Sequence, residues 1–338
     1  MGENLIGIPL AIISSIVSFI SALFIIRSWI SVAKREGLVG KDINKADKRE
    51  VAEAGGIWVV ISSIFGLLLF EAVYVFTQNK YFYLLYFYSI ITLLILSSFL
   101  GFMDDILGWK KGVPQWIRIL AMVPIALPLM IAKYNSYILS IPFFNKIYLG
   151  ILYPLIIIPI GVLGASNAYN MIAGYNGLEA GNAIILLTFT MIFGLIKGIE
   201  IVVYVSIILM GALIAFLIYN WYPAKVFPGN TFTYAIGALY AGLIILGDIP
   251  KFGLTMFFLY YIELILFIRG LFHGVYKENF GKVEGNSLMP PYERSYSITH
   301  LAIKALIKIR GKATERGVVI FIFILQIIVG IISLFLYI

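Results

Sequence analysis

The chain of 338 residues contains no cysteine, few charged residues and only two histidines. Without cysteine it can form no disulfide bond, no thiolate metal site and no cysteine nucleophile. Charged residues make up 12% of the sequence and hydrophobic residues 61%, a composition far outside that of soluble globular domains. The sequence therefore predicts an integral membrane protein.

Long apolar stretches fill most of the chain. A membrane-spanning helix needs about 20 mostly apolar residues, and we predict an all-α polytopic membrane protein that forms one domain over residues 1–338. The first stretch is too long for the core of a signal peptide and lacks a cleavage site, so we expect it to remain as a helix. The ten predicted spans are 5–33, 55–77, 82–103, 116–135, 149–165, 182–197, 200–219, 232–247, 251–272 and 317–337.

Lysine and arginine are distributed unequally between the connections. Basic connections stay in the cytoplasm, so both termini are predicted outside and five connections inside, at about 34–54, 104–115, 166–181, 220–231 and 270–316. An outer segment near 134–148 is long enough for a small hairpin. Of the 25 basic residues, 20 lie on or beside the inner face, and five lie on the outer one: Lys80, Lys133, Lys146, Lys197 and Lys251.

The net charge of +8 follows mostly from this topology. The same basic face would attract anionic lipid heads of the bilayer and phosphorylated substrates. Nothing in the sequence supports binding of nucleic acid.

Two polar clusters fall in the predicted inner connections. Asp104 and Asp105 follow the third span, and adjacent carboxylates there usually need a nearby cation, although a solvated helix end is the alternative. The second cluster is Asn167-Ala168-Tyr169-Asn170, followed by the glycine-rich segment 174–181. Asparagine carboxamides supply oxygen ligands for Mg²⁺ and pair with nucleobase edges, and glycines let the backbone approach a ligand. An Asn- and Gly-rich turn explains only part of this string.

A third cluster, from Asn220 to Phe232, reads Asn-Trp-Tyr-Pro-Ala-Lys-Val-Phe-Pro-Gly-Asn-Thr-Phe. An interfacial aromatic belt with a snorkelling Lys225 is its alternative interpretation. Two acids inside predicted spans, Glu71 and Glu263, are interpreted as structural.

Taken together, the three clusters resemble the polyprenyl-phosphate N-acetylhexosamine-1-phosphate transferases. The chain looks more narrowly like the archaeal and eukaryotic branch, which uses UDP-N-acetylglucosamine and dolichyl phosphate. The resemblance extends to Asp42-Ile43-Asn44-Lys45 with Glu53 and Gly56, and to Glu315-Arg316, so it spans nearly the whole chain. The family has ten membrane helices, outer termini and a cytosolic active site, in agreement with the topology predicted from charge.

The resemblance implies transfer of N-acetylglucosamine-1-phosphate from UDP-N-acetylglucosamine to dolichyl (polyprenyl) phosphate, with release of UMP. This is the first membrane step of N-glycan assembly on a lipid, expected at the cell (plasma) membrane with the active site facing the cytoplasm. A lipid phosphate oxygen attacks an anionic pyrophosphate, so the site must neutralise charge. Mg²⁺, with Mn²⁺ as an alternative, serves this purpose on oxygen ligands. The resemblance leaves a homodimer open.

The resemblance also implies roles for individual residues. Asn170 and Asn230 would hold the metal, and Asp104 and Asp105 would orient the lipid phosphate, neighbouring cations or the metal. A general base is not needed, because the second pKa of a phosphate monoester is about 6. Asp42 and Lys45 match positions on the phosphate side, with solvated loop charges as the alternative. The expected substrate-binding residues are Asn167, Asn176 at the uracil edge, Gly177, Glu179, Glu53, Lys111, Lys225, His273 and Arg294.

The chain departs from the family pattern at three places. Asn230 stands where the family has aspartate, which fits a compensated natural variant, a different metal arrangement or an inactivating substitution. The family's Arg-His-Arg string is absent, and Arg269, His273, Tyr292, Glu293, Arg294 and His300 are the residues available instead. The lysine usually found after the Asp-Asp pair is displaced, so Lys110, Lys111 and Arg118 compete for its role.

Other functions fit the sequence less well. A transporter would show inverted repeats and polar residues near mid-membrane, whereas the polar residues here cluster at one interface. A non-catalytic homologue that binds a nucleotide sugar is motivated by Asn230. Transfer of a different UDP-N-acetylhexosamine and the muramoyl-pentapeptide branch remain alternatives within the enzyme class.

Overall fold

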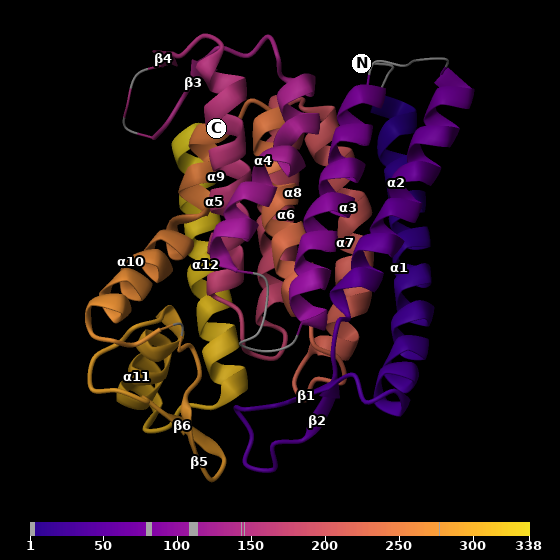
Figure 1. The fold of residues 1–338 in the computed structure, drawn as a ribbon. Coiled ribbons are helices and arrows are strands. Elements are labelled where there is room, and N and C mark those ends of the chain that lie inside the picture. Colours follow the sequence, from indigo (N-terminus) through magenta and orange to yellow (C-terminus); the bar gives the residue numbers. More distant parts are fainter. Residues whose placement is uncertain (1–3, 79–82, 108–113, 143, 145, 277) are drawn as a thin grey trace.

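The structure, a computed structural model, describes residues 4–78, 83–107, 114–142, 144, 146–276 and 278–338. It is a bundle of long helices with short strands and one further helix at its ends (Figure 1). Eight helices in the described ranges are long and apolar enough to cross a membrane. They are α1 (Asn4–Arg35), α2 (Gly56–Gln78), α3 (Leu84–Ile106), α5 (Ile158–Met171, preceded by the π-helix Tyr153–Ile157), α6 (Leu178–Lys197), α7 (Glu200–Asn220), α8 (Gly229–Leu246) and α12 (Glu315–Tyr337).

Two of the ten predicted spans look different in the structure. The predicted helix 251–272 is broken into α9 (Pro250–Met256) and α10 (Phe258–Phe272), which are bent by 55° and count as a ninth span if taken together. The predicted helix 116–135 is α4 (Gln115–Ala132), a shorter apolar helix that contains Pro124 and Pro128. A polytopic helical membrane protein is thus confirmed, with eight or nine spans by length and composition in the described part of the chain.

The described residues also form three two-stranded antiparallel hairpins, so the chain is not entirely helical. They pair β1 (Val39–Lys41) with β2 (Glu50–Ala52), β3 (Ile138–Leu139) with β4 (Ile147–Tyr148), and β5 (Lys282–Glu284) with β6 (Ser287–Met289). The hairpin predicted near 134–148 is confirmed by β3 and β4.

Helix α11 (Ile298–Arg310) lies within the predicted connection 270–316, where the sequence analysis did not expect a helix. Ser297 caps it by accepting a hydrogen bond from the backbone N–H of Thr299. Glu263 of α10 accepts from Ser297 Oγ at 3.0 Å and from the Ile298 N–H at 2.7 Å. The structural role predicted for Glu263 is therefore confirmed, since this acid ties α10 to the start of α11.

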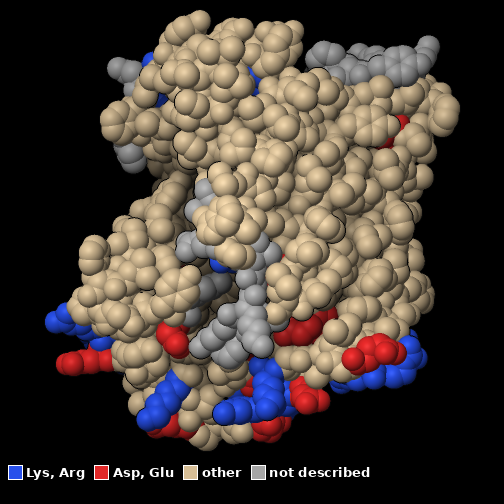
Figure 2. Space-filling model, viewed as in Figure 1, with Lys and Arg blue, Asp and Glu red and all other residues tan. Residues whose placement is uncertain are grey.

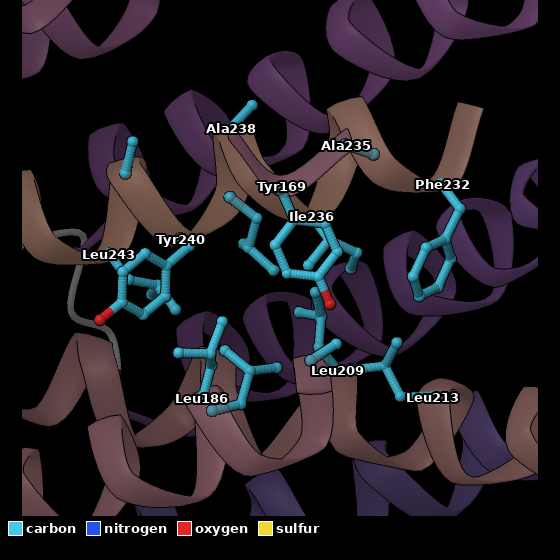
Figure 3. Packing of buried hydrophobic residues seen from close by; sticks show 14 of the residues in the cluster. Tyr169, Leu186, Leu209, Leu213, Phe232, Ala235, Ile236, Ala238, Tyr240 and Leu243 are labelled. Atoms are coloured by element: carbon cyan, nitrogen blue, oxygen red, sulfur yellow. The ribbon is translucent and has the colours of Figure 1, made fainter. Parts of the chain in front are cut away.

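Helix α8 lies at the centre of the bundle, between α3, α5 and α7. Every residue from Thr231 to Leu246 is buried. Figure 3 shows Ile236, Tyr240 and Leu243 of α8 facing Leu186 of α6 and Leu209 of α7. Because lipid tails are as apolar as these side chains, close packing and not water exclusion holds membrane helices together. A fully packed α8 therefore gives the polar groups at its first turn a fixed position.

Charged side chains gather at the end of the bundle where the β1–β2 and β5–β6 hairpins lie, seen at the bottom of Figure 2. Helix α1 begins and α12 ends at the opposite end (Figure 1). Moving a charge into the membrane interior is expensive, so this separation fits a bilayer around the apolar part. All three polar clusters of the sequence belong to the charged end.

Candidate active site

Asp105, in the last turn of α3, holds the N-terminus of α8. Its Oδ1 accepts from the Asn230 N–H at 2.7 Å, and its Oδ2 accepts from the Thr231 N–H at 3.0 Å and from Thr231 Oγ1 at 2.6 Å. Gly229, with φ +71°, makes this approach possible, because a Cβ there would lie 2.4 Å from Asp105 Oδ2. A carboxylate is well placed at a helix N-terminus, where unbonded N–H groups carry partial positive charge.

Asp104 faces a different set of partners from its neighbour. Its Oδ2 accepts from the Asn230 carboxamide Nδ2 at 2.7 Å and from the Arg118 guanidinium of α4 at 3.3 Å. Arg118 also donates to the Tyr234 hydroxyl at 2.8 Å, and the Asn170 side chain lies near that of Tyr234. We call this the α3–α8 cluster: Asp104, Asp105, Arg118, Asn170, Asn230 and Tyr234. It joins polar groups from α3, α4, α5 and α8.

Glu53 lies beside this cluster, between β2 and α2. Its carboxylate packs against the backbone of Gly40, where a Cβ would lie 2.0 Å from Glu53 Oε1. Burial raises the pKa of Glu53 from 4.5 to about 7, and the nearby charge of Asp105 adds to the shift. The site therefore contains a carboxyl group that changes its charge near neutral pH.

This raised pKa gives a testable pH dependence of stability. Glu53 is ionised in the unfolded chain above pH 4.5, whereas the folded protein keeps the proton up to about pH 7. Stability is thus lost as pH rises between these values, by roughly 3 kcal/mol in total. We expect Glu53→Gln to flatten the fall of the melting temperature between pH 5 and 8. The exposed Glu50→Gln is the control, and equal pH profiles for wild type and Glu53→Gln would contradict the assignment.

A second group, the Lys45 cluster, comprises Asp42, Lys45, Asn176, Tyr222 and Glu315. The Lys45 ammonium is buried, bonds to Asp42 Oδ2 and lies 3.0 Å from Glu315 Oε2. It also lies 4.5 Å from the centroid of the Tyr222 ring. Two carboxylates and an aromatic ring thus surround Lys45, and its role on the phosphate side stays a prediction.

Asn176 joins this cluster to the Asn- and Gly-rich connection. Its Nδ2 donates to Asp42 Oδ2 at 2.9 Å, and its backbone N–H donates to Glu315 Oε1 at 2.9 Å. Gly177, with φ +82°, donates its N–H to Asn220 Oδ1 at 3.1 Å, and a Cβ there would lie 2.6 Å from the Trp221 ring. The connection before α6 is therefore fixed by residues that are far away in the sequence.

Glu179 and Asn167 face their own segments. Glu179, buried in the first turn of α6, accepts from the Gly174 N–H at 2.9 Å and thereby closes the loop around Asn176. Asn167 donates to the Leu163 carbonyl one turn earlier in α5, at 2.8 Å. Asn167 thus bonds within its own helix, and its expected role in substrate binding stays a prediction.

A third group, the His273 cluster, comprises Arg269, His273, Arg294 and Tyr296. His273 Nδ1 lies 2.8 Å from the Arg269 carbonyl, and its Nε2 lies 2.8 Å from Arg294 Nη1. A carbonyl oxygen can only accept, so the proton of the neutral ring is on Nδ1, and Nε2 accepts from Arg294. The Arg269 guanidinium lies 5.9 Å from the Tyr296 ring centroid. Two arginines and a histidine, separate in the sequence, therefore meet in space.

The segment that carries the His273 cluster is tied to the end of α5. Asn279 Nδ2 donates to the carbonyls of Met171 and Ala173, the latter at 3.0 Å. His300 is enclosed nearby, and burial lowers its pKa to about 4. Of the two histidines, only His273 thus remains exposed, which supports its choice as the candidate.

Comparison with known proteins shows to which family the chain belongs. The sequence profile of glycosyl transferase family 4 matches residues 86–248. A protein of Saccharolobus solfataricus, named as a UDP-N-acetylglucosamine–dolichyl-phosphate N-acetylglucosaminephosphotransferase, is 35% identical over 96% of this chain and 95% of its own length. The chain belongs to glycosyl transferase family 4. The Dictyostelium discoideum protein of the same enzyme name is 27% identical over 89% of this chain and 82% of its own.

Similarity to the muramoyl branch of family 4 is less extensive. A phospho-N-acetylmuramoyl-pentapeptide-transferase of Clostridium botulinum is 33% identical, but over only 50% of this chain and 54% of its own. The family match contains the α3–α8 cluster and Asn176, whereas the Lys45 and His273 clusters draw residues from outside it. Membership of a transferase family makes the transporter interpretation wrong.

The structure brings most, but not all, of the predicted site residues into the α3–α8, Lys45 and His273 clusters. Lys225 is exposed, and no hydrogen bond or ion pair in the described ranges joins its side chain to any cluster. Lys111, like Lys110, lies outside the described residues. Of the three basic candidates after the Asp-Asp pair, Arg118 is the one seen in contact with Asp104. Tyr234 was missed, because a tyrosine in an apolar helix carries no sequence signal for a site.

Proposed function

We propose that this chain transfers N-acetylglucosamine-1-phosphate from UDP-N-acetylglucosamine to dolichyl (polyprenyl) phosphate and releases UMP. The near full-length similarity to two proteins with that enzyme name supports the substrates. The observation that carries the proposal is the α3–α8 cluster, which gathers the oxygen-bearing side chains of Asp104, Asn170 and Asn230 at the charged end of the bundle. Such a site suits transfer between two anionic phosphates.

The cluster also fits a hard divalent cation, for which we propose Mg²⁺, with Mn²⁺ as an alternative. Asp104, Asn170 and Asn230 offer only oxygen ligands, the type that Mg²⁺ prefers. These ligands carry little negative charge for a cation, because Asp105 already bonds to the start of α8 and Asp104 forms an ion pair with Arg118. No group of three or more His, Asp or Glu in the described part of the chain forms a metal site. When bound, the cation would supply neutralisation of the pyrophosphate charge.

The protein's own cations support the same chemistry. Arg118 lies beside Asp104, and we assign it to the lipid phosphate. In the His273 cluster, Arg269 and Arg294 provide two guanidinium groups for the pyrophosphate, and arginine binds phosphate through its planar fork. This assembly takes the place of a contiguous Arg-His-Arg string. His273 Nε2 carries no proton in the neutral ring. Once Arg294 turns toward phosphate, this nitrogen would accept a hydrogen bond from a sugar hydroxyl or amide instead.

We further propose that the charged end faces the cytoplasm, with both termini outside and ten membrane crossings that include α4 and the bent α9–α10 pair. The basic connections support this orientation. The chain would then act at the cell membrane in the first lipid-linked step of N-glycan assembly. A homodimer stays a prediction.

The test is release of UMP by the purified chain in detergent with a short dolichyl phosphate. We expect turnover that EDTA reduces at least tenfold. Asn230→Asp should lower the Mg²⁺ concentration for half-maximal rate by about tenfold, because it adds a carboxylate ligand. The exposed Asn135→Asp makes the same substitution away from the cluster and should change nothing.

The remaining outcomes separate the alternatives. If only Asn230→Asp turns over, the chain is a disabled form of the enzyme. If the chain releases UMP only from a different UDP-N-acetylhexosamine, the proposed sugar is wrong. If none of the variants releases UMP, the proposed reaction is overturned.

A further inference from the structure

A cavity of about 460 Å³ lies at the charged end, lined in part by Lys45, Tyr222 and Glu315 of the Lys45 cluster. Four separate segments line it: the β1–β2 turn, the turn at Tyr222, the β5–β6 hairpin and the start of α12. Figure 1 shows the two hairpins projecting at that end. The cavity contains no residue of the α3–α8 or His273 clusters. Its size is that of a small-molecule site.

The charges named around the cavity balance in number, but not every one of them is paired. Lys45 is neutralised by Asp42 and Glu315, and Arg49 forms an exposed ion pair with Asp47 at 2.7 Å. Arg316 is exposed and has no ion pair with any described residue. Its guanidinium lies 4.5 Å from the Tyr222 ring centroid and donates to the Tyr222 carbonyl at 3.3 Å. Tyr222 thus holds a guanidinium at the rim of the cavity without neutralising it.

The start of α12 adds positive potential at the same place. The helix is 23 residues long, and Thr314 caps it by accepting from the Gly317 N–H. The N–H groups of Glu315 and Arg316, at the first two helical positions, have no partner within the helix. A helix N-terminus of this kind favours an anion.

Neutral polar groups line the rest of the cavity. Asn286, Ser287 and Thr314 offer hydroxyl and amide groups. Asn44, which is 6% exposed, donates through Nδ2 to the Gly174 carbonyl at 3.1 Å, whereas its Oδ1 is buried without a partner. A buried carbonyl oxygen without a donor is unfavourable, so Asn44, a residue of the cavity wall, keeps one acceptor without a partner.

We propose that this cavity binds a phosphate ester of a small hydroxylated molecule, at a site separate from the transferase site. The phosphate lies against Arg316 and the start of α12, and the hydroxyl groups face Asn44, Asn286 and Ser287. The ligand would touch Lys45 and Glu315, whose carboxylate holds the backbone of Asn176. Occupancy would therefore reach the loop that the proposed function assigns to the nucleotide, and only this coupling depends on that proposal.

The test uses the full chain in detergent, with its melting temperature followed as ligand is added. A ligand that binds the folded state raises this temperature in a saturable manner. The probes are glycerol 3-phosphate, inorganic phosphate, and micelles containing phosphatidylglycerol as the lipid source of the same chemistry. We expect saturable stabilisation by glycerol 3-phosphate, and the phosphatidylglycerol arm tells whether a lipid headgroup serves as well.

Variants locate the binding. Arg316→Gln should weaken it about tenfold or more, since a charge-assisted hydrogen bond is lost. Asn286→Asp should also weaken it, by placing a negative charge in the cavity wall. Arg310→Gln removes an equally exposed arginine outside the cavity and should leave binding unchanged.

Three results would overturn the inference. One is the absence of saturable stabilisation in the wild type, and another is equal weakening by Arg316→Gln and Arg310→Gln. The third is displacement of the probe by UDP-N-acetylglucosamine with equal loss of both ligands in Arg316→Gln, because the cavity would then belong to the substrate site. None of these measurements needs turnover, so they fail independently of the proposed reaction.

Discussion

Lys45→Met is expected to lower the stability of the folded protein by about 3–5 kcal/mol, the usual effect of removing one partner from a buried ion pair. The ammonium lies between the carboxylates of Asp42 and Glu315, all three side chains being buried. Without it, two carboxylates face each other with little water to separate them. The melting temperature in detergent should fall by many degrees, and UMP release should fall with the amount of folded protein.

Two further variants make this expectation specific. Lys48→Met changes an exposed lysine of the same turn and should leave the melting temperature within a degree or two. Lys45→Met combined with Glu315→Gln removes one of the two unpaired charges and should recover part of the lost stability. A Lys45→Met protein that melts like Lys48→Met but has lost turnover would instead support the role on the phosphate side that the sequence resemblance implied.

The apolar spans could be predicted from sequence because they depend on local composition. The hairpin near 134–148 followed from the same signals. The boundaries of the Asn-rich connection did not, because α5 continues to Met171 and includes Asn167 and Asn170, and α6 already begins at Leu178. The break at Phe257 did not, because α9 and α10 form one continuous apolar run and the bend comes from how each half packs. Helix α11 was not predicted either, because its first residue is held by Glu263, which lies 35 residues earlier in the sequence.

The sequence indicated which residues to compare, whereas their relative positions required the fold. Asp104 and Asp105 are adjacent and were assigned together, yet they lie in one helical turn and point to different partners. The three histidine and arginine groups of the His273 cluster meet only because residues 269 and 294 are brought together across the loop. Arg118 lies 14 residues after Asp104, beyond residues 108–113, so no contiguous motif marked it. Contacts across such distances require the fold.

The two aspartates provide the sharpest contrast, because one substitution applied to neighbouring residues should have opposite consequences. In Asp105→Asn, the new amide group must face either the Asn230 N–H or the Thr231 pair, so donors oppose donors. The loss of the carboxylate at the start of α8 adds to this effect. We expect a loss of stability of roughly 2–3 kcal/mol, seen as a lower melting temperature.

In Asp104→Asn, the side chain keeps an oxygen that can accept from both Asn230 and Arg118, so the loss of stability should be smaller than in Asp105→Asn. The charge next to Arg118 and the proposed metal is lost, and the rate of UMP release should fall about 100- to 1,000-fold. Rates are to be compared per folded molecule, at a temperature where both variants remain folded. Equal losses of rate and stability in the two variants would show that the pair acts as one unit, and that Asp105 does more than hold α8 against α3.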